Sequence, residues 1–167
     1  MPQIAILMGS KSDLPSLKGC FDILKKFGLD YTARVLSAHR TPDEAADFAK
    51  NAEKDGVKVI LCAAGMAAHL GGVIAAHTIL PVVGIPMASE PFKAMDALLA
   101  MVQMPPGIPV ATVTAGSAGS KNAALLAISI LALSDKTLAE KLHAFREEQK
   151  EMVLKADASI MDEIAKL

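Results

Sequence analysis

Five short runs of mostly apolar and β-branched residues, each followed by a turn and then by a longer helical segment, limit what this chain can fold into. None of them shows the regular polar-apolar alternation of a strand with one solvated face. Such runs are typical of strands in a parallel sheet that helices cover on both faces. The runs are residues 3–8, 31–36, 57–63, 81–85 and 109–114.

The segments between these runs complete a repeated strand-helix pattern. Gly28 and Gly56 follow the first two helical segments, where a glycine commonly ends a helix. Five alternations of strand and helix predict a three-layer αβα fold with right-handed crossovers. We expect a flavodoxin-like parallel sheet with the strand order 2-1-3-4-5. Helices are predicted to end at residue 27, to cover residues 42–55, to end near residue 78, and to cover residues 92–102 and 122–133.

The last part of the chain departs from this pattern. Ser134 and Asp135 are expected to cap a helix that continues to about residue 156 or beyond. This helix is long for one small sheet to cover, and its apolar residues form a sparse stripe among charges. We therefore expect a single domain over residues 1–167, in which residues 134–167 form a helical extension that packs on a neighbouring subunit. The alternative is a solvated tail. The stripe consists of Leu138, Leu142, Phe145, Met152 and Val153.

Composition and charge exclude several classes of function. The chain has 167 residues and a formal net charge of −1, and no basic run indicates a nucleic-acid-binding surface. No segment resembles a signal peptide and no apolar run is long enough to span a bilayer, so we expect a cytoplasmic protein that does not bind membranes. Cys20 and Cys62 lie in a predicted helix and a predicted core strand, which favours buried thiols in a reducing compartment. No spacing of Cys, His and Asp indicates a metal site.

A His-Arg pair follows the second predicted strand. Thr41 and Glu44 have the spacing of a helix start, with Thr41 as the cap and Glu44 completing a capping box. The short turn therefore places His39 and Arg40 at the carboxyl end of a strand, the edge at which open α/β sheets bind ligands. An imidazole, a guanidinium and free backbone N–H groups suit a small anionic substrate. The alternative is an exposed pair without a function.

The loop after the first strand, residues 9–13, offers similar chemistry. Ser10 and Ser12 supply hydroxyl groups that suit a phosphate, and Asp13 supplies a carboxylate that suits ribose hydroxyls. Ordinary capping of the next helix by Ser12 or Asp13 is the alternative. The spacing matches neither a P-loop nor a dinucleotide-binding glycine fingerprint.

The loop after the third strand, residues 64–72, consists almost entirely of small residues. Such residues allow a planar ring to approach the backbone, and His69 is the only titratable group there. A partly buried histidine bonded to backbone is the alternative for His69. Residues 116–120 resemble a phosphate-binding loop superficially and are equally consistent with a flexible connector. His77 and His143 have no partner pattern, and we interpret both as structural or surface residues.

Five segments, spread over most of the chain, carry a recognisable pattern: MGSKSD at 8–13, SAHRTP at 37–42, AGMAAHL at 64–70, VQMPPGIP at 102–109 and NAALLA at 122–127. Taken together, these segments resemble the PurE family of purine biosynthesis, and the likeness covers almost the whole chain. Class I of that family is 5-(carboxyamino)imidazole ribonucleotide mutase, and class II is an aminoimidazole ribonucleotide carboxylase that uses carbon dioxide directly. Class II usually has Lys after the motif histidine and a Ser-Asn pair in the third loop, so Arg40 and the sequence Ala67-Ala68-His69 match class I.

The resemblance implies a homo-octamer that acts on a small ribonucleotide and uses neither a metal nor an organic cofactor. It implies that His39 is the general acid and base, that Arg40 meets the phosphate and that Asp13 meets the ribose. The other substrate-binding positions that it implies are Ser10, Ser12, Ser37, Ala38, Gly65, Ala67, His69 and Leu70. The chain departs from class I at Met66, where Gly is common, at Gly71, where Pro is common, and over residues 91–94, which are usually a small-residue segment with Gly.

Two other functions stay open from the sequence. One is a class II carboxylase with the same fold. The other is a non-enzymatic flavodoxin-like module that binds a nucleotide or a flavin. The aromatic content of 4% disfavours flavin stacking.

Overall fold

The computed structural model describes residues 1–167 and contains one sheet of five parallel strands in the order β2-β1-β3-β4-β5. This confirms the predicted fold class and strand order. The chain divides into two compact units, residues 1–130 and residues 131–167. The strands are β1 (Ile4–Met8), β2 (Tyr31–Val35), β3 (Val59–Gly65), β4 (Val82–Met87) and β5 (Ala111–Thr112).

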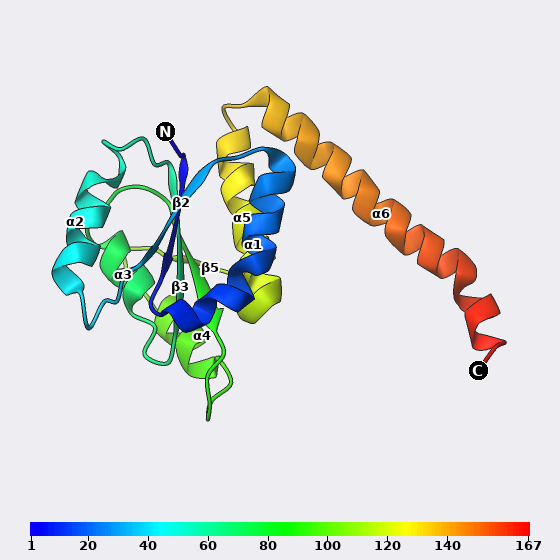
Figure 1. The fold of residues 1–167 in the computed structure, drawn as a ribbon, viewed down its shortest axis with the longest axis horizontal. Helices are drawn as coiled ribbons and strands as arrows, with labels where there is room; N and C mark the ends of the chain where they lie inside the picture. The colour runs from blue at the N-terminus through cyan, green and yellow to red at the C-terminus, as the bar shows by residue number, and fades with distance from the viewer. The chain divides into compact units, whose positions relative to one another are not determined.

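Helices cover both faces of the sheet, which makes the first unit a three-layer structure (Figure 1). One face carries α2 (Pro42–Ala52), α3 (Leu70–Ala75) and α4 (Met95–Val102), and the other carries α1 (Leu14–Phe27) and α5 (Gly116–Ala132). All residues of β1 and β4 are buried, as expected for central strands between two helical layers. Both cysteines are buried free thiols, as predicted.

The register of the central strands aligns their carboxyl ends. Met8 at the end of β1 lies opposite Val35 of β2 on one side and Ala63 of β3 on the other. Gly65 at the end of β3 lies opposite Met87 of β4. The loops that follow these four strands therefore begin at the same edge of the sheet.

Two local predictions were wrong. Helix α5 begins at Gly116, so residues 116–120 form its first turn and are neither a phosphate loop nor a connector. A Cβ added at Gly119 would overlap the carbonyl oxygen of Thr114, so the small residues there allow the helix to start close to the preceding segment.

Thr41 precedes α2 but makes no side-chain cap bond, so the second of these predictions, a capping box of Thr41 and Glu44, was wrong. Its hydroxyl instead accepts a hydrogen bond from the Ser37 N–H at 2.8 Å and donates one to the Ser37 carbonyl at 3.2 Å.

The second unit consists mainly of α6 (Lys136–Ile164), the long C-terminal helix that the sequence predicts. The Asp135 carboxylate caps it by accepting a hydrogen bond from the Leu138 N–H at 3.1 Å. Met152 and Val153 in its second half are 56% and 68% exposed. None of the helices combines the length and the hydropathy needed to cross a membrane.

Candidate functional site

A cleft of about 580 Å³ lies at the carboxyl edge of the sheet. Every residue to which the sequence analysis assigned a catalytic or binding role lines it: Ser10, Ser12, Asp13, Ser37, Ala38, His39, Arg40, Gly65, Ala67, His69 and Leu70. The structure therefore gathers residues from three separate loops in one place. The cleft is also lined by Met87, Ala88 and Ser89, which the sequence analysis missed. The predicted strand order could have found them, because it places the end of β4 beside the end of β3.

The first loop is held by a capping box that belongs to Ser10. Its hydroxyl accepts a hydrogen bond from the Ser12 N–H at 3.2 Å, and the Asp13 Oδ2 accepts one from the Ser10 N–H at 3.2 Å. The Ser10 and Ser12 hydroxyl oxygens lie 2.8 Å apart. Burial raises the pKa of the Asp13 carboxyl, and the hydrogen bond from the Ser10 N–H partly opposes that rise. Capping therefore occurs in this loop with Ser10 as the N-cap and Asp13 as its partner in the capping box, whereas the predicted capping of α1 by the side chain of Asp13 does not occur.

Arg40 joins the second loop to the first. Its Nη2 donates a hydrogen bond to the Gly9 carbonyl oxygen at 3.0 Å. The Ser37 hydroxyl oxygen accepts from the Arg40 backbone N–H at 3.2 Å and has a longer contact of 3.5 Å with the Arg40 Nε. A guanidinium has five N–H donors, so these contacts leave donors for an anionic ligand. The Arg40 side chain is thus oriented before any ligand arrives.

His39 and His69 form a hydrogen-bonded pair across the cleft loops. The Nε2 of His39 lies 2.9 Å from the Nδ1 of His69, and the two rings meet edge to face with centroids 5.0 Å apart. A hydrogen bond between two imidazoles requires an N–H on one nitrogen and a lone pair on the other. The alternative interpretation of His69, a partly buried histidine bonded to backbone, is therefore wrong, because this ring is exposed and bonds to another side chain.

In the third loop, Met66 has a left-handed backbone conformation, which glycine adopts more easily than other residues. Met66 has a φ of 57°, and in this left-handed region a residue with a Cβ is less stable by about 1–2 kcal/mol. Lys93 and Ala94, in the other segment that departs from the class I pattern, have φ values of 49° and 78°. These three residues therefore hold a backbone conformation that glycine adopts most easily.

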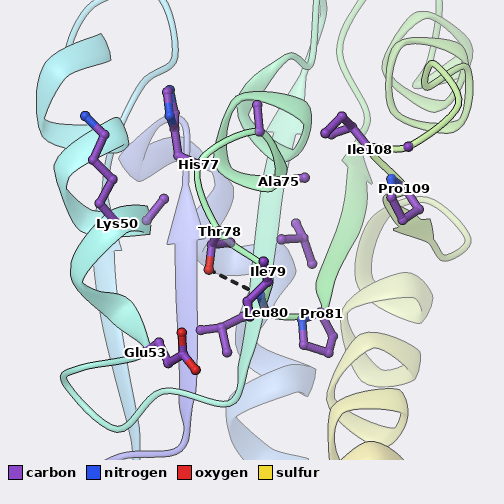
Figure 2. Close-up of a pocket in the computed structure, with 14 residues that line it drawn as sticks. Lys50, Glu53, Ala75, His77, Thr78, Ile79, Leu80, Pro81, Ile108 and Pro109 are labelled. Atoms are coloured by element: carbon purple, nitrogen blue, oxygen red, sulfur yellow. Dashed lines mark hydrogen bonds between the residues drawn. The ribbon is translucent and has the colours of Figure 1, made fainter.

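A second, larger cleft of about 850 Å³ lies at the opposite edge of the sheet, before β4 and β5 (Figure 2). Its floor is mostly apolar, and the only hydrogen bond drawn in it runs from the Leu80 N–H to the Thr78 hydroxyl at 3.2 Å. His77 lines this cleft with Lys50 and Glu53, and no hydrogen bond or ion pair joins those three side chains. The polar side chains of this second cleft therefore form no connected group that could act on a substrate. No cluster of three or more His, Cys, Asp or Glu side chains that could hold a metal ion occurs in the structure.

Comparison with known proteins gives a consistent result. The sequence model of the AIR carboxylase family matches residues 3–152. The N5-carboxyaminoimidazole ribonucleotide mutase of Saccharolobus solfataricus is 52% identical over 154 residues, which cover 92% of this chain and 96% of the relative. The protein of the same name from Bacillus subtilis is 47% identical over 160 residues, which cover 96% of this chain and 99% of the relative. The crystal structure of Treponema denticola PurE superposes with a TM-score of 0.85 at 31% identity, over 95% of this chain and 98% of that one.

Proposed function

The chain belongs to the AIR carboxylase family, and we propose that it is an N5-carboxyaminoimidazole ribonucleotide mutase of purine biosynthesis. The observation that carries this proposal is the cleft in which an imidazole, a guanidinium and a carboxyl group come together at the carboxyl edge of the sheet. Relatives at about half identity over nearly the whole chain have this name. Arg40 and the Ala67-Ala68-His69 sequence favour the mutase over the carboxylase that uses free carbon dioxide.

The reaction moves a carboxyl group from the exocyclic nitrogen to carbon 4 of the imidazole ring. The nitrogen-carbon bond of the carbamate breaks, carbon dioxide leaves, and the nitrogen gains a proton. The resulting aminoimidazole is an enamine, so its carbon 4 attacks the carbon dioxide and then loses its own proton. We assign both proton transfers to His39: its imidazolium protonates the nitrogen, and the neutral imidazole removes the proton from carbon 4.

The polar residues of the cleft suit the two ends of a ribonucleotide. We assign the phosphate to Arg40, whose contacts with Gly9 and Ser37 leave guanidinium donors for an anion. We assign the ribose hydroxyls to Asp13, whose Oδ1 makes no hydrogen bond within the chain. Ser10, Ser12 and Ser37 supply further hydroxyl groups around these positions.

We assign to the third loop, residues 64–72, the retention of carbon dioxide beside the imidazole ring of the substrate. Gly65 and Ala67 line the cleft and present no polar side chain, so they allow close contact with a flat heterocycle. Holding the released carbon dioxide next to carbon 4 turns a reaction between two molecules into one within a single complex. Such proximity supplies a large part of the rate enhancement of reactions of this kind.

We further propose a cytoplasmic homo-oligomer, with eight copies as the family resemblance implies, in which residues 134–167 pack on a neighbouring subunit. The exposed apolar residues Met152, Val153 and Leu154 of α6 support such a contact. Light scattering tests the assembly directly. The double variant Met152→Glu, Val153→Glu should lower the molar mass, whereas Glu151→Gln on the same helix should not. A wild-type monomer would overturn this part of the proposal.

The activity is tested with two parallel reactions followed by NMR. The first contains freshly made 5-(carboxyamino)imidazole ribonucleotide without ATP or added bicarbonate, and the second contains aminoimidazole ribonucleotide with bicarbonate. A control without protein corrects for the spontaneous decay of the first substrate. Rapid carboxylated product in the first reaction alone supports the mutase. Product mainly in the second reaction would indicate a class II carboxylase, and product in neither would leave a non-enzymatic binding module.

A further inference from the structure

The His39–His69 hydrogen bond determines which ring nitrogen of His39 can exchange a proton with a ligand. The Nε2 of His39 is engaged with the Nδ1 of His69 at 2.9 Å, and the Nδ1 of His39 makes no hydrogen bond within the chain. As long as the pair stays intact, Nδ1 is the only nitrogen of His39 that is free to give or take a proton.

We infer that His69 is a positioning residue that fixes the tautomer of His39 for both proton transfers. This inference rests on the proposed function. In the starting form, the His39 imidazolium donates its Nε2–H to the lone pair on the His69 Nδ1, and His69 is a neutral imidazole with its own proton on Nε2. The proton that His39 gives to the substrate is the one on Nδ1.

The advantage of this arrangement appears after the first transfer. When the nitrogen-carbon bond of the substrate breaks, the His39 Nδ1–H passes to the exocyclic nitrogen and His39 becomes neutral. Its remaining proton stays on Nε2, because the lone pair of His69 accepts it there. The lone pair of His39 is then on Nδ1, the atom that must accept the proton from carbon 4. That second transfer restores the imidazolium, so protons balance over the cycle.

Without His69, the neutral His39 ring is free to place its proton on Nδ1 instead. In that tautomer the nitrogen that gave up the first proton has no lone pair with which to take the second. A neutral hydrogen-bond acceptor on Nε2 therefore has the role that an orienting carboxylate has beside other catalytic histidines. The difference is that His69 adds no negative charge to a cleft that must bind a carbamate and a phosphate.

The other charged groups that line the cleft make no hydrogen bond to the Nε2 of His39. They are Asp13 from the first loop and Arg40 from the same loop as His39. The Asp13 carboxylate accepts from the Ser10 N–H, and the Arg40 guanidinium donates to the Gly9 carbonyl oxygen. In the segment after β4, Glu90 and Lys93 lie close in sequence to the lining residue Ser89, but they do not line the cleft themselves. His69 is thus the one side chain that holds Nε2 of His39.

Two variants of His69 separate positioning from simple lining of the cleft. His69→Phe keeps a planar ring and removes the acceptor, so we expect kcat to fall roughly 10- to 100-fold, a part of the 10²–10⁴-fold that general acid-base catalysis supplies. KM should change by less than about threefold, because the phosphate and ribose contacts are assigned to Arg40 and Asp13, which stay in place. His69→Asn retains an acceptor oxygen and should recover much of kcat. His77→Asn in the other cleft is the matched control and should leave kcat unchanged.

A spectroscopic measurement tests the inference without any turnover. The chain has 4 histidines, so selective ¹⁵N-histidine labelling gives a small set of ring signals, which the single variants assign. In the neutral form, wild-type His39 should show the proton on Nε2, and His69→Phe should show a mixture of both tautomers. An unchanged tautomer in His69→Phe, or a loss confined to KM, would overturn the inference. If the wild-type protein lacks mutase activity, the proposed function fails while the tautomer result still stands or falls independently.

Discussion

Replacing Arg40 by Lys should weaken ribonucleotide binding through the phosphate and leave the fold intact. The guanidinium donates to the Gly9 carbonyl oxygen at 3.0 Å and contacts the Ser37 hydroxyl at 3.5 Å, while other N–H donors stay available for an anion. A lysine ammonium is a compact charge that cannot bridge the two loops and form a two-pronged contact with a phosphate at the same time. The variant therefore keeps the attraction between opposite charges but loses the fixed geometry.

The size of the effect follows from the number of contacts. A hydrogen bond to a charged group contributes about 1.5–3 kcal/mol, and loss of one prong of a two-pronged phosphate contact is the expected change. Because about 1.4 kcal/mol corresponds to a factor of ten, the Kd for aminoimidazole ribonucleotide should rise roughly 10- to 100-fold. Isothermal titration calorimetry measures this value directly.

The same titration with the phosphate-free ribonucleoside identifies the group that Arg40 contacts. The ribonucleoside should bind wild type and Arg40→Lys with similar, weak affinity. Arg34→Lys is the matched control, because Arg34 lies over the ring of Phe48 at 5.9 Å and does not line the cleft. An unchanged Kd for the ribonucleotide, or an equal loss for the ribonucleoside, would refute the phosphate assignment.

Three further predictions concern other parts of the molecule. His39→Asn should keep the wild-type circular dichroism spectrum and lose at least about 100-fold in kcat, because general acid-base catalysis contributes about 10²–10⁴-fold; a rate near that of the wild type would exclude His39 as the proton-transfer group. Gly119→Ala should lower the free energy of unfolding by about 2 kcal/mol or more, because the new Cβ overlaps the Thr114 carbonyl oxygen. Gly71→Ala, whose new Cβ has its nearest contact at 3.5 Å, should change the free energy of unfolding by less than about 1 kcal/mol. Equal urea midpoints for the two variants would contradict this explanation. Burial raises the pKa of Asp13 above the unfolded value of 3.8, so its carboxylate opposes folding at neutral pH and this penalty disappears as the pH falls through the raised pKa. Urea unfolding should therefore show wild type gaining stability relative to Asp13→Asn as the pH is lowered from 7 towards 4, and a difference independent of pH would argue against burial as the cause.

The sheet and the location of the cleft could be predicted because both follow from simple rules of packing. Continuous apolar runs predict buried parallel strands, and strands that alternate with helices place their carboxyl ends on one edge. The structure has that order and puts Met8, Val35 and Ala63 side by side. These rules therefore predict from the sequence alone that loops far apart along the chain lie together at one edge of the sheet.

The details that escaped the sequence analysis depend on distances rather than on residue types. Ser10 and Thr41 have equally good capping chemistry, yet Ser10 forms the capping box and Thr41 bonds to Ser37 instead. The small residues at 116–120 are compatible with a loop and with a tightly packed helix start, and only the closeness of Thr114 to Gly119 decides between them. Likewise, two histidines 30 positions apart give no sign in the sequence that their rings touch.

The register of β1, β2 and β3 determines how far along the strand direction each loop of the cleft begins. Neighbouring strands lie about 4.8 Å apart, and each residue advances a strand by about 3.3 Å. One residue inserted into β1 would shift the 9–13 loop along that axis and turn the following side chains to the opposite face, separating the Asp13 and Arg40 groups that one ligand must span. The same insertion between α2 and β3 would leave every loop of the cleft at its level. Length changes in this family should therefore be far better tolerated at the amino edge of the sheet than within its strands.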